Sequence, residues 1–226
     1  MKAATTEKPS NVEHTVTDQQ SRFTLETKAY YTDIETYDWV DVCDHFRGLE
    51  SIFHRNRERV MRRLVRQHAA PGRFLDVGTG TGLNLRHLPP ASVGLDINPR
   101  NMGKVRRYAP QSRLTLGDAE ALPLQSDAFS TVLCTEVLEH LPNPEQAVAE
   151  IERVLAPGGV LIGSVPGQSP IWKLRFLSST CPHDEPFHRM FRRAEVNDLL
   201  SVLDLQWISY SFLRINILFV ARKRVR

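Results

Sequence analysis

Cysteine is scarce in this chain, which has 226 residues and only three cysteines, Cys43, Cys134 and Cys181. These three lie far apart and show none of the short spacings that are typical of metal sites. A small odd number of thiols suits a reducing compartment. The first 20 residues lack the apolar core of a secretion signal, and no apolar run approaches the roughly 18 residues that cross a bilayer. We therefore expect a cytoplasmic protein without a membrane span.

A large net charge is also absent, since the formal charge is +3 and charged residues make up 24% of the chain. Such a balance does not by itself demand a nucleic-acid partner. One local excess is the group of six arginines between Arg55 and Arg66, which alternates with apolar residues at helical spacing. This pattern favours an amphipathic helix with a solvated basic face over a surface for an anionic partner.

The length fits one domain, and the pattern along the chain divides it into three parts. Residues 1–20 show no apolar periodicity and are predicted to be a disordered tail. Residues 21–70 become helical and are predicted to form a cap, which ends at Pro71-Gly72. Residues 71–226 alternate short apolar runs with helical segments, which predicts an α/β domain with a parallel sheet and helices on both faces.

Within this domain we expect strands at 73–77, 92–97, 113–116, 129–134 and 160–165, with helices at 83–88, 101–108, 144–155 and 194–203. The Pro157-Gly158-Gly159 run is expected to stop the third of these helices. The last two strand-like runs, 207–213 and 217–221, are joined by too few residues for a crossover, so they must pair antiparallel.

A glycine-rich turn follows the first expected strand in the run Asp76-Val77-Gly78-Thr79-Gly80-Thr81-Gly82-Leu83. Glycine lets the backbone turn sharply and approach a ligand closely, and a following helix adds free N–H groups. The dinucleotide fingerprint G-x-G-x-x-G needs a glycine where this chain has Leu83. The carboxylate of Asp76 repels a pyrophosphate but suits a cationic ligand such as an amino-acid ammonium. Both features count against a dinucleotide-dependent oxidoreductase.

Acidic residues also stand at or just after the ends of the next two strands. Asp96 closes the second strand, where a carboxylate can accept hydrogen bonds from two ribose hydroxyls. Asp118 and Ala119 follow the third strand, where a carboxylate and a backbone N–H can read an adenine edge. An adenosine-containing ligand therefore fits the edge of the sheet.

Four runs, in order and correctly spaced over about residues 73–166, resemble the motifs of class I S-adenosylmethionine-dependent methyltransferases of the type 11 family. They are LDVGTGTG, GLDINP, GDAEALPLQSDAFSTV and CTEVLEHLPNPEQAVAEIERVLAPGGVLIGSVP. The resemblance implies a Rossmann-like, seven-stranded mixed sheet of strand order 3-2-1-4-5-7-6 and methyl transfer to a small-molecule acceptor. It also implies that S-adenosylmethionine is held by Tyr31, Asp76, Gly78, Gly80, Gly82, Asp96, Ile97, Asp118, Ala119 and Thr135.

Methyl transfer chiefly needs alignment of the reacting atoms in a site that excludes water. A base is needed only where the acceptor carries a proton, and His140 and His188 are the predicted candidates, because histidine titrates near neutrality. His188 lies with His183, a further candidate for the base, in residues 167–190, which are predicted to be a substrate-side insert. Residues 21–45, with Tyr30 and Tyr31, are expected to close over the cofactor.

A metal-dependent reaction is one alternative, because Glu136, Glu139 and His140 stand at i, i+3 and i+4 and would share one face of a helical turn. The spacing resembles the metal-binding Glu-x-x-Glu-His of ubiquinone-pathway O-methyltransferases and small-RNA 2′-O-methyltransferases. It also occurs in type 11 relatives that use no metal, and we predict that none binds here.

A nucleic-acid acceptor is a second alternative. It is disfavoured because the Asn/Asp-Pro-Pro-Tyr/Phe tetrad of many amino-directed nucleic-acid methyltransferases is absent after the fourth strand. A non-catalytic module that merely binds the cofactor is a third alternative. The identity of the acceptor and the atom that is methylated stay open at this point.

Overall fold

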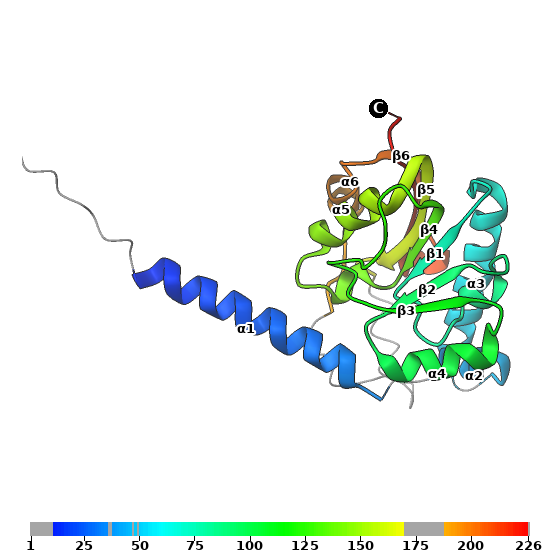
Figure 1. The fold of residues 1–226 in the computed structure, drawn as a ribbon, viewed down its shortest axis with the longest axis horizontal. Coiled ribbons are helices and arrows are strands. Elements are labelled where there is room, and N and C mark those ends of the chain that lie inside the picture. Colours follow the sequence, from blue (N-terminus) through cyan, green and yellow to red (C-terminus); the bar gives the residue numbers. More distant parts are fainter. Residues whose placement is uncertain (1–10, 36–37, 47, 49, 170–187, 226) are drawn as a thin grey trace, which may run out of the picture.

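The computed structural model describes residues 11–35, 38–46, 48, 50–169 and 188–225. Its centre is a seven-stranded sheet of order β3-β2-β1-β4-β5-β7-β6 (Figure 1). The strands are β1 Phe74–Val77, β2 Val93–Asp96, β3 Arg113–Leu116, β4 Phe129–Thr135, β5 Leu155–Pro166, β6 Asp204–Tyr210 and β7 Asn216–Arg222. The predicted strand order is confirmed.

The first five strands run parallel, and β7 is antiparallel to both β5 and β6. The predicted antiparallel hairpin is therefore confirmed, although β6 begins earlier than expected, at Asp204. Because β1, β2, β3, β4 and β5 share one direction, their carboxyl ends meet at one edge of the sheet. The residues of β1 and β2 are all buried, as expected for strands that are covered on both faces.

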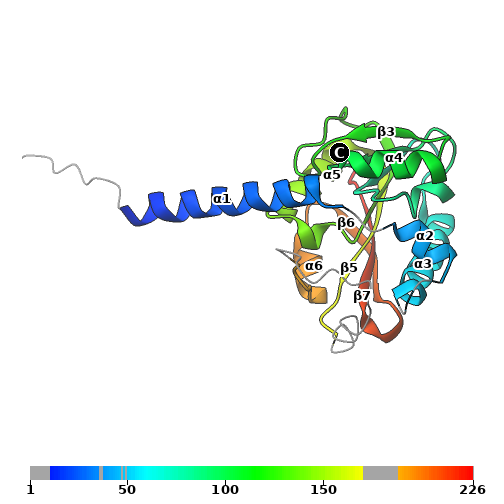
Figure 2. The same ribbon diagram turned by 90° about the horizontal axis from the view of Figure 1, so that it is seen from below.

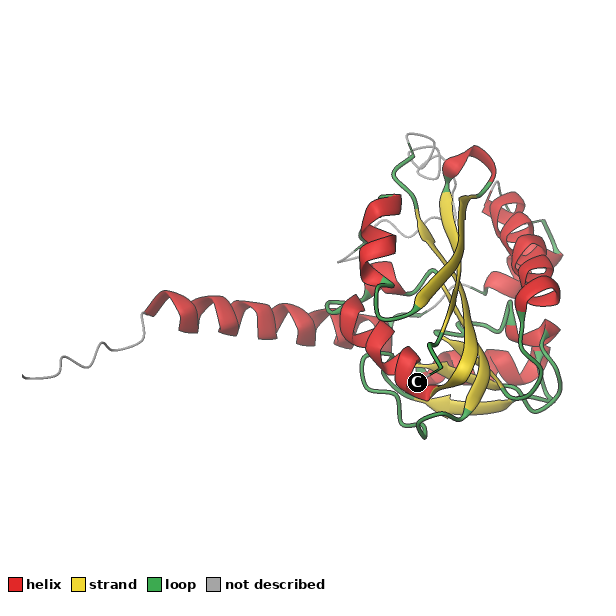
Figure 3. Cartoon of the chain, turned by 90° about the horizontal axis from the view of Figure 1, so that it is seen from above, coloured by secondary structure: helices red, strands yellow, loops and turns green. Residues whose placement is uncertain are grey.

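Helices cover both faces of the sheet (Figure 3). The helices are α1 Asn11–Asp33, α2 Trp39–Asp44, α3 Glu50–His68, α4 Pro99–Tyr108, α5 Pro144–Val154 and α6 Arg193–Leu199. On one face α3 packs Met61 and Leu64 against β5 and β7, whereas α5 and α6 belong to the core on the other face. Figure 2 shows α3 and α6 on opposite sides of the strands. No helix among the described residues is both long and apolar enough to cross a membrane.

The N-terminal helix corrects one expectation. The predicted disordered tail is wrong for residues 11–20, because α1 begins at Asn11 and runs for 23 residues. The helix extends away from the rest of the chain, and its C-terminal end lies nearest the sheet (Figures 1 and 2). A polar helix without an apolar stripe has no hydrophobic periodicity, so this pattern does not predict it.

Two further boundaries differ from expectation. The helix α5 ends at Val154, and β5 begins at Leu155, so Pro157-Gly158-Gly159 lies inside a strand instead of between elements. The register with β4 shifts there, between Phe129 and Thr131. The expected helix after the glycine turn is only a 3₁₀ turn, η1 Leu85–His87. The helix-terminus argument for that turn is therefore wrong, and the glycine backbone itself forms the loop.

Candidate functional site

The glycine turn leaves β1 in a conformation that only glycine adopts readily. Gly78, Gly80 and Gly82 have φ angles of 65°, 54° and 94°. A Cβ atom on Gly78 would lie 2.3 Å from Cγ2 of Val137, and one on Gly80 would lie 3.5 Å from the ring of Trp39. The turn therefore passes in close contact with the segment after β4 and faces α2 on its other side.

Asp76, the third residue of β1, is a buried carboxyl group with one oxygen left over. The residue is 1% exposed, and its Oδ2 accepts a 2.8 Å hydrogen bond from the Thr79 hydroxyl. Its Oδ1 is buried and has no hydrogen-bond partner among the described residues. Burial raises the pKa of Asp76 to about 7; the charge of Asp96 adds to this rise, and the Thr79 hydrogen bond opposes it. A cationic N–H donor of a ligand beside Oδ1 would give this oxygen a hydrogen-bond partner.

The raised pKa of Asp76 predicts a pH-dependent stability. The folded protein holds this proton up to about pH 7, whereas an unfolded chain releases it near pH 4. The free energy of unfolding should therefore fall as the pH rises from about 4 to about 7, by up to about 4 kcal/mol, and then level off. Urea unfolding at pH 5 and pH 8 measures this, and Asp76→Asn should remove that part of the decline. Parallel pH profiles for the two proteins would contradict the assignment.

Asp96 ties the glycine turn to the loop that follows β2. Its Oδ2 accepts a hydrogen bond of 2.7 Å from the Gly80 N–H, and its Oδ1 accepts bonds from the Asn98 N–H and the Asn101 side chain, at 2.9 and 3.1 Å. Burial raises the pKa of this carboxyl, and its hydrogen bonds, including one from the N–H of Ile97, oppose the rise. The carboxylate thus has a structural role whether or not it also binds a ligand.

The end of α1 lies over the carboxyl ends of β2 and β3. Lys28 Nζ is 2.6 Å from a carboxylate oxygen of Asp118 and 2.6 Å from one of Glu120, on either side of the buried Ala119. The Asn98 amide donates to the backbone oxygens of Tyr31 and Ile34, at 3.1 and 2.8 Å. One residue of the N-terminal helix therefore contacts both acidic side chains that follow β3.

The structure brings together three aromatic residues that lie far apart in the sequence. The Tyr31 hydroxyl is 2.8 Å from Nδ1 of His140, and the His140 ring centroid is 5.2 Å from that of His188. Nε2 of His140 is 3.8 Å from a carboxylate oxygen of Glu139, which is almost fully buried. Of the predicted bases, His140 and His188 thus lie side by side, while His183 lies outside the described residues.

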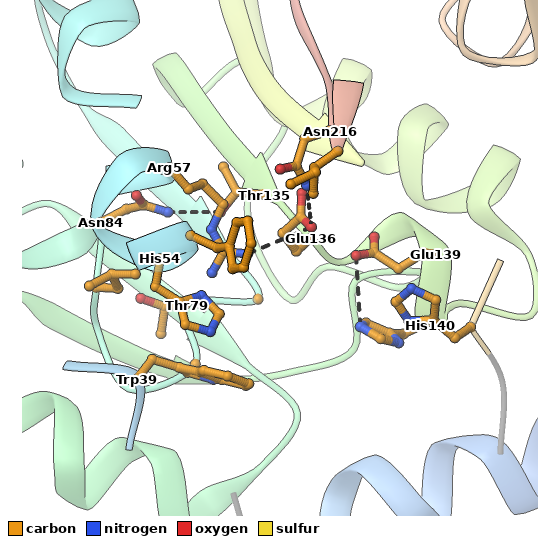
Figure 4. A pocket seen from close by; sticks show the side chains of 16 residues that line it. Trp39, His54, Arg57, Thr79, Asn84, Thr135, Glu136, Glu139, His140 and Asn216 are labelled. Carbon is orange, nitrogen blue, oxygen red and sulfur yellow. Dashed lines mark hydrogen bonds and ion pairs between the residues drawn. The ribbon is translucent and has the colours of Figure 1, made fainter. Parts of the chain in front are cut away.

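A pocket opens at the same edge, and Gly78, Gly80, Thr135, His140 and His188 lie along its wall (Figure 4). Inside it the Thr135 hydroxyl accepts a 2.7 Å hydrogen bond from the Asn84 amide. Several pocket residues had no assigned role in the sequence prediction: Trp39, Phe53, His54, Arg57, Leu83, Asn84, Ile215 and Asn216. For Arg57 a signal existed, because it stands four residues after Phe53 and four before Met61, on the apolar stripe of its helix.

Glu136 begins the segment after β4 in a backbone conformation that is unusual for its residue type, with a φ of 54°. Its Oε1 accepts a hydrogen bond of 2.6 Å from the Ser164 hydroxyl, and its Oε2 accepts one of 2.7 Å from the Asn216 amide. Only Leu138–His140 forms a 3₁₀ turn, η2, so the helical turn that the i, i+3, i+4 spacing needs does not form. Glu136 points toward Asn216, away from Glu139 and His140 (Figure 4). Within the described part of the chain, no cluster of three or more histidine, cysteine, aspartate or glutamate side chains is arranged to hold a metal.

Comparisons with known proteins point to one family. A family model described as a methyltransferase domain matches residues 75–163. A 2-methyl-6-phytyl-1,4-hydroquinone methyltransferase of Oryza sativa subsp. japonica is 31% identical over 137 residues, which are 56% of this chain and 39% of the relative. A protein of Mycolicibacterium smegmatis, named a probable S-adenosylmethionine-dependent methyltransferase, is 31% identical over 156 residues, 67% of this chain and 58% of the relative. The chain thus spans roughly 40–60% of the length of these curated relatives.

Among solved structures, a possible histamine N-methyltransferase from Thermotoga maritima superposes with a TM-score of 0.63, over 82% of this chain and 98% of that one. At 19% identity this likeness shows the fold alone. The family match is more specific, since it contains the glycine turn, Asp96, Asp118 and Thr135 in one continuous stretch. Through residues 75–163, the chain belongs to the class I S-adenosylmethionine-dependent methyltransferases of the type 11 family.

Proposed function

We propose that this chain transfers a methyl group from S-adenosylmethionine to a small-molecule acceptor. One observation carries the proposal: the glycine turn, the buried carboxylate of Asp96 and the Oδ1 of Asp76, which has no hydrogen-bond partner among the described residues, meet at one edge of the sheet. When bound, the cofactor supplies a methyl group that its sulfonium already activates. A cationic amino-acid group suits the acidic side of the turn, and a vicinal diol suits a carboxylate at a strand end.

The proposed contacts follow the same edge. Gly78, Gly80 and Gly82 would lie beside the methionine portion, together with Asp76 and Thr135. Asp96 and Ile97 would hold the ribose, and Asp118 and Ala119 the adenine. For Tyr31 the 2.8 Å contact of its hydroxyl with His140 supports an indirect role, in which it orients that ring. The contacts of Lys28, Tyr31 and Ile34 support the proposal that residues 21–45 form a lid on the domain at 71–226.

The chain's own residues would align the acceptor and keep water out. Trp39, Phe53 and Leu83 give the pocket apolar walls, which favour a site with little water. His140 is the proposed base where the acceptor carries a proton, because the buried Glu139 carboxylate near its Nε2 stabilises an imidazolium. His188 packs against this ring and is the second candidate.

The experiment is methyl transfer from S-adenosylmethionine with a tritiated methyl group into a cell extract, which is then separated into small molecules, nucleic acid and protein. We expect the label in the small-molecule fraction. The family relative named for a hydroquinone makes hydroquinones and catechols the first pure acceptors to test. Cofactor binding without transfer into any fraction would favour the non-catalytic module. Label in the nucleic-acid fraction would mean that the acceptor is a nucleic acid and not a small molecule.

His140→Asn tests the proposed base. With an acceptor that loses a proton, kcat should fall by about 10²–10⁴-fold, the range of general-base contributions, while cofactor affinity stays unchanged. The matched control is His45→Asn, since His45 is an exposed residue at the end of α2. Equal kcat values for wild type and His140→Asn would leave His188 as the candidate.

A further inference from the structure

Arg57 differs from the other arginines of α3 in where its side chain lies. Its side chain is only 17% exposed and lines the pocket, whereas Arg59, Arg62 and Arg63 are exposed to solvent. The residues one turn away on the same stripe are Phe53 and Met61, and Met61 is part of the core against the sheet. The helix therefore places a permanent positive charge on its inward face.

This partly exposed guanidinium has few partners among the described residues. Its one ion pair or hydrogen bond with a described residue is an ion pair of 3.6 Å between Nη1 and Oε2 of Glu136, which is longer than a hydrogen bond. Its Nε is buried and has no hydrogen-bond partner among the described residues. Arg86, by comparison, is held by hydrogen bonds to both carboxylate oxygens of Asp44 and to Glu58. A guanidinium carries five N–H donors, and within the described part of the chain no hydrogen bond from Arg57 is found.

The partner of Arg57 is itself occupied by neutral donors. The two oxygens of Glu136 accept hydrogen bonds from Ser164 and Asn216, which fix the carboxylate toward β5 and β7. Figure 4 shows Arg57 and Asn216 approaching Glu136 from different directions. Glu136 therefore orients Arg57 without taking up its donors, and the guanidinium is available to a ligand in the pocket.

We propose that Arg57 binds a carboxylate in this pocket. The planar guanidinium fork matches a carboxylate in two parallel hydrogen bonds, and the apolar walls at Trp39 and Phe53 strengthen such a pair by excluding water. The inference rests on the proposed function, which offers two sources: the carboxylate of the cofactor's methionine portion, and a carboxylate on the acceptor. Both molecules would enter the pocket that Gly78, Gly80 and Arg57 line.

The experiment compares Arg57→Gln with wild type and with Arg59→Gln, a matched control at an exposed position of the same helix. Calorimetry first measures the affinity of each protein for two ligands. S-adenosylhomocysteine has the amino-acid carboxylate of the methionine portion, and 5′-methylthioadenosine lacks the amino-acid part. If the cofactor supplies the carboxylate, Arg57→Gln should lower the affinity for S-adenosylhomocysteine by about tenfold to a hundredfold and leave the affinity for methylthioadenosine unchanged.

The second arm uses protein saturated with S-adenosylhomocysteine and titrates benzoate against benzamide. If the acceptor supplies the carboxylate, wild type and Arg59→Gln should prefer benzoate by about tenfold or more, and Arg57→Gln should lose that preference. Arg57→Lys, which keeps the charge but not the fork, should retain part of either effect. It also keeps the comparison possible if Arg57→Gln fails to fold.

The inference is overturned if Arg57→Gln binds S-adenosylhomocysteine as wild type does and wild type shows no preference for benzoate. In that outcome the wild-type affinity for S-adenosylhomocysteine still stands in support of the proposed function. Wild-type protein that binds neither S-adenosylhomocysteine nor methylthioadenosine would instead remove the proposed function, and this inference with it.

Discussion

Gly78→Ala is expected to destabilise the protein by about 2–5 kcal/mol and to abolish measurable binding of S-adenosylhomocysteine. The backbone at Gly78 has a φ of 65°, which costs a residue with a Cβ atom about 1–2 kcal/mol. The added methyl group would also lie 2.3 Å from Cγ2 and 3.2 Å from Cγ1 of Val137. Valine is stiff at χ1, so relief requires the turn or the segment after β4 to move, and overpacking of this kind costs about 1–3 kcal/mol.

Gly103→Ala is the matched control for this change. Gly103 lies inside α4, and a Cβ atom there would have no heavy atom within 4 Å. Alanine in a helix interior is favoured over glycine by about 0.5–1 kcal/mol, so this variant should be more stable than wild type. Chemical unfolding of the three proteins, with calorimetry of S-adenosylhomocysteine, measures both effects. A Gly78→Ala protein with the stability and affinity of wild type would mean that the turn is not built as described.

The sheet could be predicted because its pattern is local and repeated. Each strand is a short apolar run followed by a turn residue, and parallel order follows from the helices between the runs. The acidic residues at the ends of the first three strands then meet without any further information, since parallel strands share an edge. Asp76 and Asp96 are the clearest examples, because both lie within hydrogen-bond reach of the glycine turn, at Thr79 and Gly80.

What the sequence did not indicate depends on contacts between distant segments. The spacing of Arg57 from Phe53 and Met61 places it on the apolar stripe of its helix, but that this stripe lines a pocket beside Glu136 follows only from the packing of α3. The pairing of Lys28 with Asp118 and Glu120 joins residues about 90 positions apart. Likewise, the side chain of Glu136, whose backbone is left-handed, is held by Ser164 and Asn216 from two distant strands. Neither periodicity nor spacing contains such information.

Asp96 is the residue where the proposed cofactor contact and the fold are most closely joined, and this changes what its replacement should do. Asp96→Ala should lower the affinity for S-adenosylhomocysteine by about tenfold to a hundredfold, because the charge-assisted hydrogen bonds to the ribose are lost. It should also lower the free energy of unfolding by about 1–3 kcal/mol, because donors on Gly80, Asn98 and Asn101 lose their acceptor. An affinity measured on this variant alone would mix the two effects.

Asp96→Asn separates them, because the amide oxygen still accepts from one side while the charge is gone. We expect this variant to recover part of the lost stability but to bind S-adenosylhomocysteine at least about tenfold more weakly than wild type. The control is Asp198→Asn, which removes an exposed carboxylate on α6 and should change neither quantity. Calorimetry and urea unfolding of the four proteins give the comparison. If Asp96→Asn binds with wild-type affinity, the carboxylate supports the glycine turn and α4 only, and the ribose must be held elsewhere.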